Sequence, residues 1–272
     1  MKLYANYHTH TWRCGHARGT DREYIERAIL EGTRILGFSD HAPYRFPNGS
    51  RSGIRMETGR LEEYFRTLTD LKREYAGQIR IHIGLEAEYC PALFGDLIGA
   101  LRQYPCEYLL LGQHFFGSED FNVASRPVSD PEVFRRYVDQ VLEGLSTGLF
   151  TYLAHPDYVR WLGDGRTYRR EMERLCREAK TMGIPLEINV NGIRGRAHYP
   201  TKAFWTLAGQ TGNDVILGTD HHYPEGIDLK NLGTDPYDPE IHGSMNIERR
   251  LNELITGCAL NVVQTVPLRP IR

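Results

Sequence analysis

The sequence predicts an α/β fold in which a parallel sheet closes into a barrel. Two observations point to it: short apolar runs alternate with segments of helical period, and histidines or acids follow nearly every run. Alternating strands and helices are typical of βα units, whose strands lie parallel in one sheet. A doubly wound open sheet shows the same alternation, so the alternation alone does not distinguish a barrel from an open sheet.

The positions of the histidines and acids favour the barrel. They follow at least six different strands, spread over the whole sequence, and must meet in space if they share a function. A barrel brings the carboxyl ends of all its strands to one mouth, whereas an open sheet gathers only a few at its switch point. We therefore expect a metal site at the C-terminal mouth of a single barrel domain over residues 1–272.

Each expected element rests on its own local pattern. Helices are expected from the capping box that begins at Thr20, over 61–75, from Ser129 or Asp130 with Pro131 in the first turn, and over 168–182. Seven buried strands are expected between such segments, at 2–7, 35–39, 79–85, 108–112, 150–154, 185–189 and 214–218.

Three connections are unusually long for a compact domain. Residues 40–59, 115–129 and 221–243 are rich in Gly, Pro, Ser and Asp, and all follow strands on the side of the histidines. Loops of that length are usually functional. We expect them to surround the site.

Composition narrows the class of protein. The 272 residues are 40% hydrophobic and 25% charged, with a formal net charge of -2. Such a charge gives no general attraction to nucleic acid or to anionic membranes. Five cysteines without a C-x-x-C pair argue against a disulfide framework and for a reducing compartment. Residues 1–7 are too short and polar for a signal peptide. We expect a cytoplasmic protein with neither nucleic acid nor membrane as a partner.

The histidine pair His8 and His10 is the first sign of a metal site. In an extended segment both side chains point to one side, and two imidazoles suit a divalent transition metal. Alone such a pair is weak evidence, but further ligand types recur at other strand ends. His82 lies within a strand and is interpreted as structural. Cys14 could be a ligand, although a small loop residue is the favoured interpretation.

The motifs at the strand ends are Tyr7-His8-Thr9-His10-Thr11, Ser39-Asp40-His41-Ala42-Pro43, Gly84-Leu85-Glu86, Gly112-Gln113-His114, Ala154-His155-Pro156-Asp157 and Gly218-Thr219-Asp220-His221-His222. Together they resemble the polymerase and histidinol phosphatase (PHP) superfamily over nearly the full chain. The stretch Cys14-Gly15-His16-Ala17, with the helix that follows, is similar to the histidinol-phosphatase branch in particular. The resemblance implies a distorted seven-stranded (βα) barrel.

The resemblance also implies three divalent metal ions, which the mixed ligands would allow to be Zn, Mn or Fe. One ion would bind His8, His10, Glu86 and Asp220. A second would share Glu86 and add His114 and His155. A third would bind His16, His41 and His222. A bridging carboxylate can hold two cations at the spacing that clamps an in-line displacement.

Spacing leaves several residues ambiguous. Glu86 and Glu88 can face the same way, and the family motif favours Glu86; its Asp-x-His spacing likewise selects His222 over His221. Asp40 and Asp157 suit the orientation of ligand imidazoles, although Asp157 is equally suited to a helix cap or turn.

Arginines on the mouth loops are the candidate phosphate contacts. Arg160 and Arg194 resemble phosphate-binding positions of the branch, and a guanidinium fork suits a phosphoryl group. A further loop carries Arg45, Arg51 and Arg55, which could gate or bind, though most are expected to be solvated. Residues 191–199 and the Asp220-His221-His222 tripeptide differ from the commonest forms of the branch, which bears on substrate identity.

We therefore expect a metal-dependent phosphomonoesterase acting on a small phosphorylated substrate, as a monomer or small homo-oligomer. The expected reaction converts L-histidinol phosphate and water to L-histidinol and phosphate, in histidine biosynthesis. A hydroxide bridging two metals would attack phosphorus, with Asp40 and His221 as candidates to protonate the leaving group. The alternatives are the same centre acting on a nucleotide or sugar phosphate, a PHP-type exonuclease, and a non-catalytic metal-binding module.

Overall fold

Eight parallel strands form the central sheet in the part of the chain that the computed structural model describes, residues 1–49, 51–116, 122–123, 126–230 and 246–272. Their order in the sheet follows their order in the chain. The strands are β1 (Ala5–Asn6), β2 (Ile35–His41), β3 (Arg80–Ala87), β4 (Tyr108–Leu111), β7 (Phe150–Leu153), β8 (Leu186–Asn189), β9 (Asp214–Gly218) and β10 (Asn261–Val262). The first seven correspond to the predicted strands. β10 was not predicted, because a two-residue strand has too little pattern to recognise.

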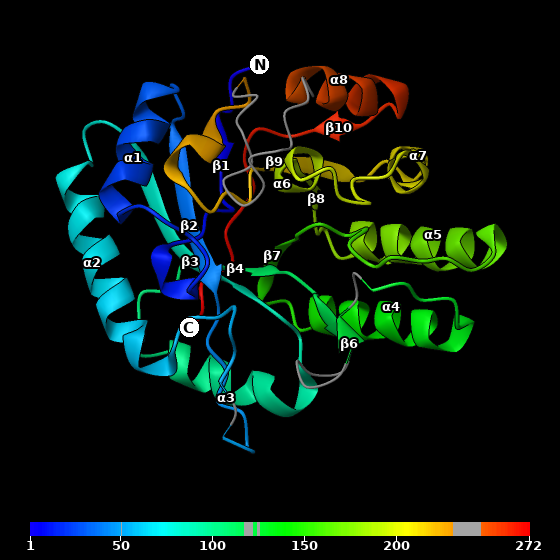
Figure 1. Cartoon of the computed structure of the whole chain (residues 1–272), viewed down its shortest axis with the longest axis horizontal. Coiled ribbons are helices and arrows are strands. Elements are labelled where there is room, and N and C mark those ends of the chain that lie inside the picture. The colour runs from blue at the N-terminus through cyan, green and yellow to red at the C-terminus, as the bar shows by residue number, and fades with distance from the viewer. Residues whose placement is uncertain (50, 117–121, 124–125, 231–245) are drawn as a thin grey trace.

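Helices surround this sheet on the outside, as Figure 1 shows. They are α1 (Asp21–Leu30), α2 (Leu61–Glu74), α3 (Pro91–Leu101), α4 (Pro131–Ser146), α5 (Gly165–Thr181), α6 (Val190–Arg194), α7 (Lys202–Thr211) and α8 (Ile247–Gly257), with short 3-10 turns η1 (Trp12–Cys14), η2 (Thr58–Arg60) and η3 (Pro224–Ile227). Thr20 and Glu23 form the predicted capping box. Asp130 caps α4 with Pro131 in its first turn, and α5 begins earlier than predicted, after the cap Asp164.

The sheet curls until the end of β1 meets the end of β9. Beyond β1, Thr9 forms a parallel bridge with His221. The Asp220 amide donates to the His8 carbonyl at 3.0 Å, and the His10 amide donates to the His221 carbonyl at 3.2 Å. The predicted distorted parallel barrel is therefore confirmed, with its closure at the ends of β1 and β9.

Alternation along each strand separates two apolar layers. In β4, Leu109 and Leu111 join the large core between sheet and helices. Tyr108 and Leu110 belong to a smaller cluster inside the curled sheet. The Tyr108 hydroxyl donates to the carbonyls of Tyr7 and Phe38, each at 2.8 Å. Successive side chains point to opposite faces of a strand, so this inner cluster fills the barrel beneath its mouth.

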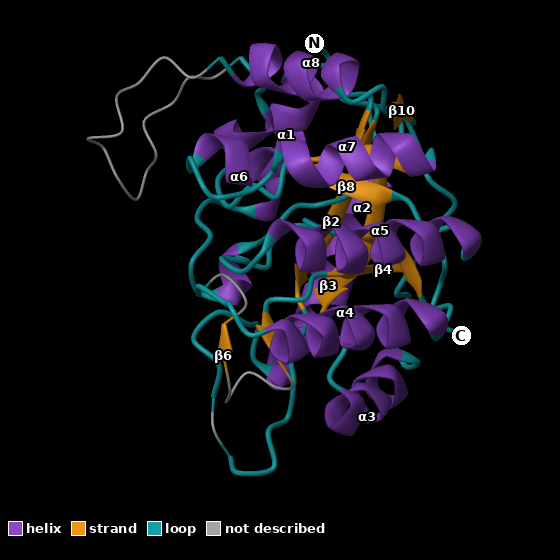
Figure 2. Cartoon of the chain, turned by 90° about the vertical axis from the view of Figure 1, so that its right-hand side faces the viewer, coloured by secondary structure: helices purple, strands orange, loops and turns teal. Residues whose placement is uncertain are grey.

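The carboxyl ends of the strands share one side of the molecule. In Figure 2, α6, β6 and several long connections lie together on that side. There β5 (Phe115–Phe116) and β6 (Asn122–Val123) form a separate antiparallel pair. Residues 50, 117–121, 124–125 and 231–243 of the three predicted long loops lie outside the described residues.

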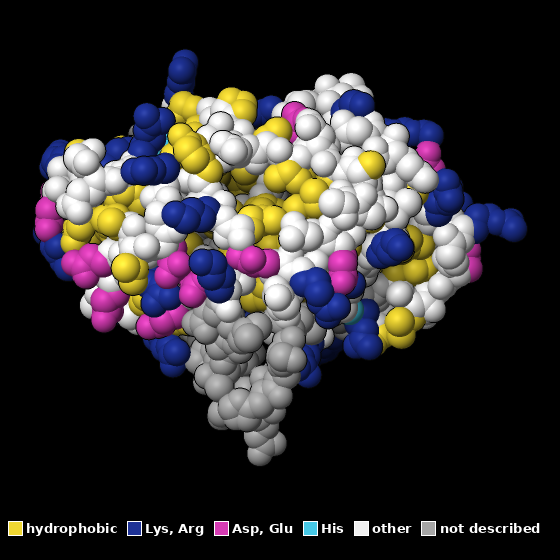
Figure 3. Space-filling view, turned by 90° about the horizontal axis from the view of Figure 1, so that it is seen from above, with side chains coloured by type: hydrophobic (Ala, Val, Ile, Leu, Met, Phe, Trp, Pro, Cys, Tyr) yellow, Lys and Arg dark blue, Asp and Glu magenta, His cyan; other side chains and the backbone are white. Residues whose placement is uncertain are grey.

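The five cysteines are buried and free. Among the helices of the described residues, none is both long and apolar enough to cross a membrane. On the face seen in Figure 3, Lys and Arg side chains are interspersed with Asp and Glu rather than gathered into one basic tract.

Candidate metal centre

Glu86 is the centre of the site. It stands near the end of β3, beside His41 in the β2–β3 register, and is 1% exposed. Five imidazoles approach its carboxylate: Oε2 lies 3.0 Å from His41 Nδ1 and 3.5 Å from the Nε2 atoms of His8 and His10, while Oε1 lies 2.8 Å from His155 Nε2 and 3.7 Å from His114 Nε2. The structure thus selects Glu86, rather than Glu88, as the carboxylate shared among the predicted ligands.

Gly112 leaves the room that Glu86 occupies. A Cβ atom at Gly112 would lie 1.9 Å from Glu86 Oε1, far inside contact distance. Gly112 follows β4, the neighbour of β3 in the sheet. The glycine in the Gly112-Gln113-His114 motif therefore allows the carboxylate to sit against the backbone.

Asp220 supplies a second carboxylate, which lies beside His8 and His10. Its Oδ1 lies 3.0 Å from His10 Nε2 and 3.5 Å from His8 Nε2. Asp220 and His155 both have positive φ angles, 47° and 30°. Such a backbone costs free energy in a non-glycine residue and is common at functional sites. Here it occurs at two strand ends that present predicted ligands.

A third group of imidazoles adjoins His10. Its ring lies 4.1 Å from that of His222 and 4.3 Å from that of His41, and the His16 ring lies 4.6 Å from that of His222. Donor atoms of His10, His41 and His222 lie within 4.8 Å of one another, as do those of Cys14, His16 and His222. All nine predicted ligands are thus brought together, while their division among three ions stays a prediction.

The buried donor atoms fit a metal better than they fit one another. Among the described residues, His8 Nε2 and His222 Nε2 are buried and lack a hydrogen-bond partner. The contacts of His10 Nε2 and His41 Nδ1 with carboxylate oxygens, at 3.0 Å, do not have hydrogen-bond geometry. Buried polar atoms are nearly always paired. A set of imidazole and carboxylate donors converging on one place suits a divalent cation such as Zn, Mn or Fe.

The pKa shifts of Glu86 and His222 suit a cation. Burial would raise the pKa of Glu86, but the charges of His8, His114 and His41 hold that pKa well below its ordinary value. Burial, together with the charge of His10, holds the pKa of His222 well below its ordinary value. Glu86 is therefore ionised and His222 is neutral near pH 7, the forms that bind metals.

Two buried residues behind the ligands escaped prediction. Glu187 on β8 is fully buried, and its Oε2 lies 2.8 Å from His8 Nδ1. The side-chain amide nitrogen Nδ2 of Asn189 donates to Glu187 Oε1 at 2.8 Å and to Asp220 Oδ2 at 3.0 Å. The signal was present, because Glu187 and Asn189 are polar residues at alternate positions of an otherwise apolar strand.

Asp40 lies beside two predicted ligands, and Asp157 stands in the turn after His155, as its turn alternative predicts. Asp40 Oδ1 is 3.6 Å from His10 Nδ1 and accepts the His41 amide at 2.9 Å. The Asp157 carboxylate accepts the amide of Thr201, the residue that caps α7, at 2.6 Å, and burial raises the pKa of Asp157 to about 6.

A cavity of about 500 Å³ opens above these groups, and neither the predicted phosphate contact Arg160 nor the predicted proton donor His221 is among its described lining residues. Arg160 is exposed on the surface. His221 is fully buried, with Nδ1 2.7 Å from the Thr219 hydroxyl and its ring 5.2 Å from that of Tyr24. The roles of Arg160 as a phosphate contact and of His221 as a proton donor stay predictions. The lining residues are His16, His41, Ile54, His114, Phe115, Tyr158, Asn191, Arg194, Gly195, Ala197, Tyr199, Asp220, His222 and Tyr223.

Fold and site together define the class of protein. The PHP domain family matches residues 6–191. The chain belongs to the PHP domain family, as its motifs predicted. The chain is also similar to two curated relatives. It is 33% identical to "Histidinol-phosphatase" of Bacillus subtilis, over 79% of this chain and 92% of that protein. It is 28% identical to "Probable histidinol-phosphatase" of Deinococcus radiodurans, over 82% and 88% respectively.

Solved structures agree on the fold. The histidinol phosphate phosphatase of Lactococcus lactis, solved with Zn, L-histidinol and phosphate, superposes with a TM-score of 0.68 at 18% identity, over 97% of this chain and 98% of that one. A putative histidinol phosphatase of Listeria monocytogenes gives a TM-score of 0.67 at 20% identity, over 82% and 97%. The distorted PHP-type barrel is thereby confirmed as the fold class.

Proposed function

We propose that this chain is a metal-dependent phosphomonoesterase that hydrolyses L-histidinol phosphate to L-histidinol and phosphate, a step of histidine biosynthesis. The observation that carries the proposal is the buried Glu86 carboxylate ringed by five imidazoles beneath an open cavity. The histidinol-phosphatase names of the Bacillus subtilis and Deinococcus radiodurans relatives support the choice of substrate.

The proposed site holds three divalent ions of Zn, Mn or Fe. Glu86 and Asp220 would supply the carboxylates, and the imidazoles would come from His8, His10, His16, His41, His114, His155 and His222. When bound, such ions lower the pKa of water toward neutrality and neutralise charge on phosphoryl oxygens.

Residues of the chain hold the substrate. The reaction adds water to phosphorus while the ester P–O bond breaks, and the departing histidinol oxygen takes a proton. Arg194 lines the cavity, and its Nη2 donates to the Gly226 carbonyl at 2.9 Å. A guanidinium has five N–H donors, so Arg194 can keep that bond and still bind a phosphoryl oxygen. The bond to Gly226 would hold the fork in place for the phosphate.

Two measurements test the proposal. The first compares kcat/KM for L-histidinol phosphate with a panel of nucleotide and sugar monophosphates, and the second is elemental analysis of the purified protein. We expect L-histidinol phosphate to be the preferred substrate. Asp220→Ala and His8→Ala should nearly abolish turnover of L-histidinol phosphate, because each removes one of the proposed metal ligands. Full turnover in either metal-depleted variant would refute the mechanism.

A second candidate is the same hydrolysis on a different phosphomonoester. It is favoured by a relative called "Probable phosphatase" in Acetivibrio thermocellus, 25% identical over 82% of this chain and 80% of that protein. In the same panel this candidate predicts that a nucleotide or sugar phosphate exceeds L-histidinol phosphate in kcat/KM.

A further inference from the structure

The side chain of Glu88 is held by four donors. Its Oε1 lies 2.6 Å from Arg55 Nη2 and 2.9 Å from His114 Nδ1. Its Oε2 accepts the backbone amides of His114 at 3.0 Å and Phe115 at 3.3 Å. Glu88 is 4% exposed, so its charge is removed from water. The carboxylate thus contacts both the ring and the backbone of a candidate metal ligand.

Arg55 reaches Glu88 from the long loop between β2 and α2. Unlike the solvated arginines expected there, it is 5% exposed. Its guanidinium lies over the rings of Tyr44, at 5.2 Å, and Phe115, at 5.8 Å. The Tyr44 hydroxyl also donates to the Glu88 carbonyl. Arg55 therefore binds the loop to the same residue that holds His114.

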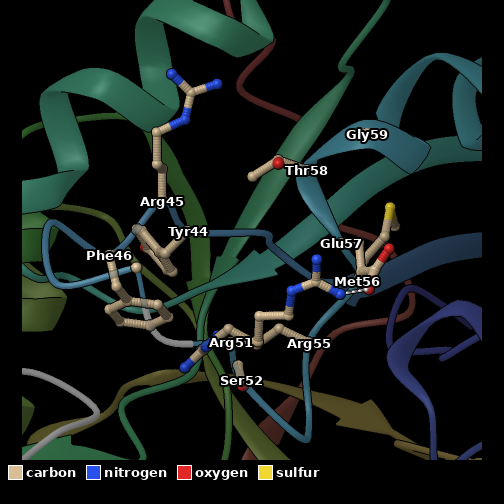
Figure 4. A pocket seen from close by; sticks show the side chains of 11 residues that line it. Tyr44, Arg45, Phe46, Arg51, Ser52, Arg55, Met56, Glu57, Thr58 and Gly59 are labelled. Carbon is tan, nitrogen blue, oxygen red and sulfur yellow. Dashed lines mark hydrogen bonds and ion pairs between the residues drawn. The ribbon is translucent and has the colours of Figure 1, made fainter.

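Arg55 and Tyr44 line a hollow of about 240 Å³ on this loop, shown in Figure 4. Two other arginines of the hollow differ from Arg55. Arg45 is exposed, and the Arg51 side chain is 86% exposed and pairs with Glu57 at 3.2 Å, the dashed line in Figure 4. Arg51 is therefore a matched control for Arg55, with the same charge on the same loop.

The physical effect on His114 follows from the direction of its hydrogen bond. A carboxylate only accepts, so His114 Nδ1 is the donor to Glu88, and Nε2, 3.7 Å from Glu86 Oε1, is the ring nitrogen left to bind a metal. Carboxylates that bind the second nitrogen of a ligand histidine fix its tautomer and ring orientation. A buried carboxylate needs a cation, because removing one partner of a buried pair leaves an uncompensated charge.

We propose that Arg55 is a positioning residue for the metal ion bound by His114, acting through the Glu88 carboxylate. The inference rests on the proposed function only in taking His114 as a metal ligand. The ion pair of Arg55 with Glu88 couples the loop after β2 to the metal position of His114. The other metal positions do not depend on this ion pair.

The test titrates metal-free protein with Zn²⁺ alone, against a chromophoric chelator, at constant pH. In Arg55→Met one Zn²⁺ equivalent should weaken about 10–100-fold, the range typical of residues behind metal ligands. The remaining equivalents should be unchanged, and so should all equivalents in Arg51→Met. Arg55→Lys keeps the charge but loses the planar fork, so it should recover part of the affinity.

A double-mutant cycle separates positioning from general destabilisation. In a His114→Ala background, Arg55→Met should cause no further loss of Zn²⁺ affinity, since both changes act on one position. A loss that adds in full, or parental Zn²⁺ binding by folded Arg55→Met, would overturn the proposal. If Arg55→Met does not fold, Glu88→Gln decides by the same titration, and unchanged affinity there also overturns it. Arg55-dependent Zn²⁺ binding without hydrolysis of L-histidinol phosphate would contradict the proposed function alone.

Discussion

The Glu187 carboxylate lies 2.8 Å from Nδ1 of His8, whose Nε2 faces Glu86 and Asp220 at 3.5 Å. Both residues are fully buried, Glu187 on β8 and His8 beyond β1. Burial opposes protonation of His8, but Glu187, Asp220 and Glu86 outweigh it and hold the His8 pKa well above its ordinary value. The imidazole is thus fixed from behind by one carboxylate and directed at two others.

Glu187→Gln should weaken metal binding without removing a ligand. Glutamine keeps the size of the side chain but loses the charge that orients His8, so we expect metal affinity to fall about 10–100-fold. Titration of the metal-free protein measures it. The control is Glu178→Gln on the exposed face of α5, which should bind metal as the parent does. Parental affinity in both variants would show that His8 needs no carboxylate behind it.

Gly112→Ala should displace Glu86. The added Cβ would lie 1.9 Å from Glu86 Oε1, so the carboxylate must move away from the imidazoles around it. We expect loss of metal content and a fall in kcat of about 100-fold or more, because misplaced groups are costly in catalysis. Gly99→Ala is the control, since a Cβ there meets nothing within 4 Å and alanine favours the helix. Normal metal content in folded Gly112→Ala would contradict the central role of Glu86.

Arg194→Ala should act mainly on KM. Arg194 lines the cavity, whereas Arg160 is exposed and is not among the lining residues. Loss of a charged hydrogen bond to phosphate costs about 1.5–3 kcal/mol, which corresponds to a rise in KM of about 10–100-fold. Steady-state kinetics with L-histidinol phosphate measure the split between kcat and KM. Arg160→Ala should leave both constants near the parental values, and an equal rise in KM for the two variants would restore Arg160 to the phosphate site.

Glu107→Gln should lower stability in a pH-dependent way. Burial opposes ionisation of Glu107, but His82, Lys72 and the Ile83 amide lower its pKa to about 2 from 4.5. Because the folded pKa is depressed, this stabilisation is present above pH 4.5 and is lost as pH falls toward 2.

We expect Glu107→Gln to reduce the free energy of unfolding by about 1 kcal/mol at pH 7, with the difference shrinking below pH 4.5. Denaturant melts at several pH values measure it. Glu57→Gln breaks only an exposed pair with Arg51 and should change little at any pH. If the difference in the free energy of unfolding between Glu107→Gln and the parent did not vary with pH, the charge of Glu107 would not be what stabilises the protein.

Sequence reasoning reached the ligands because their placement follows from chain direction. His41, Glu86, His114 and His155 each stand at or just beyond the end of a parallel strand. Parallel strands end on the same side, so their meeting was predictable once the strands were recognised. The same reasoning could not separate His221 from His222, since adjacent residues in a turn differ only in the backbone angles that aim them.

Sequence patterns did not predict the contacts between elements that are distant in the chain. Arg55 and Arg51 stand on one loop, yet the first is buried against Glu88 and the second is exposed. Arg160 is a candidate because it follows the Ala154-His155-Pro156-Asp157 motif, and the structure leaves it exposed. Such differences depend on which neighbours fill the space around a side chain.

The sequence by itself determined the family, the parallel barrel and the residues able to bind a metal, because strand periodicity and motif spacing are local properties. Only the tertiary structure decided how those residues are held. Closure of the sheet between β1 and β9 brings Asp220 to His8 and His10, and burial places Glu187 and Glu88 behind their imidazoles. Burial and distance arise from chain segments far apart in the sequence, so no local pattern contains them.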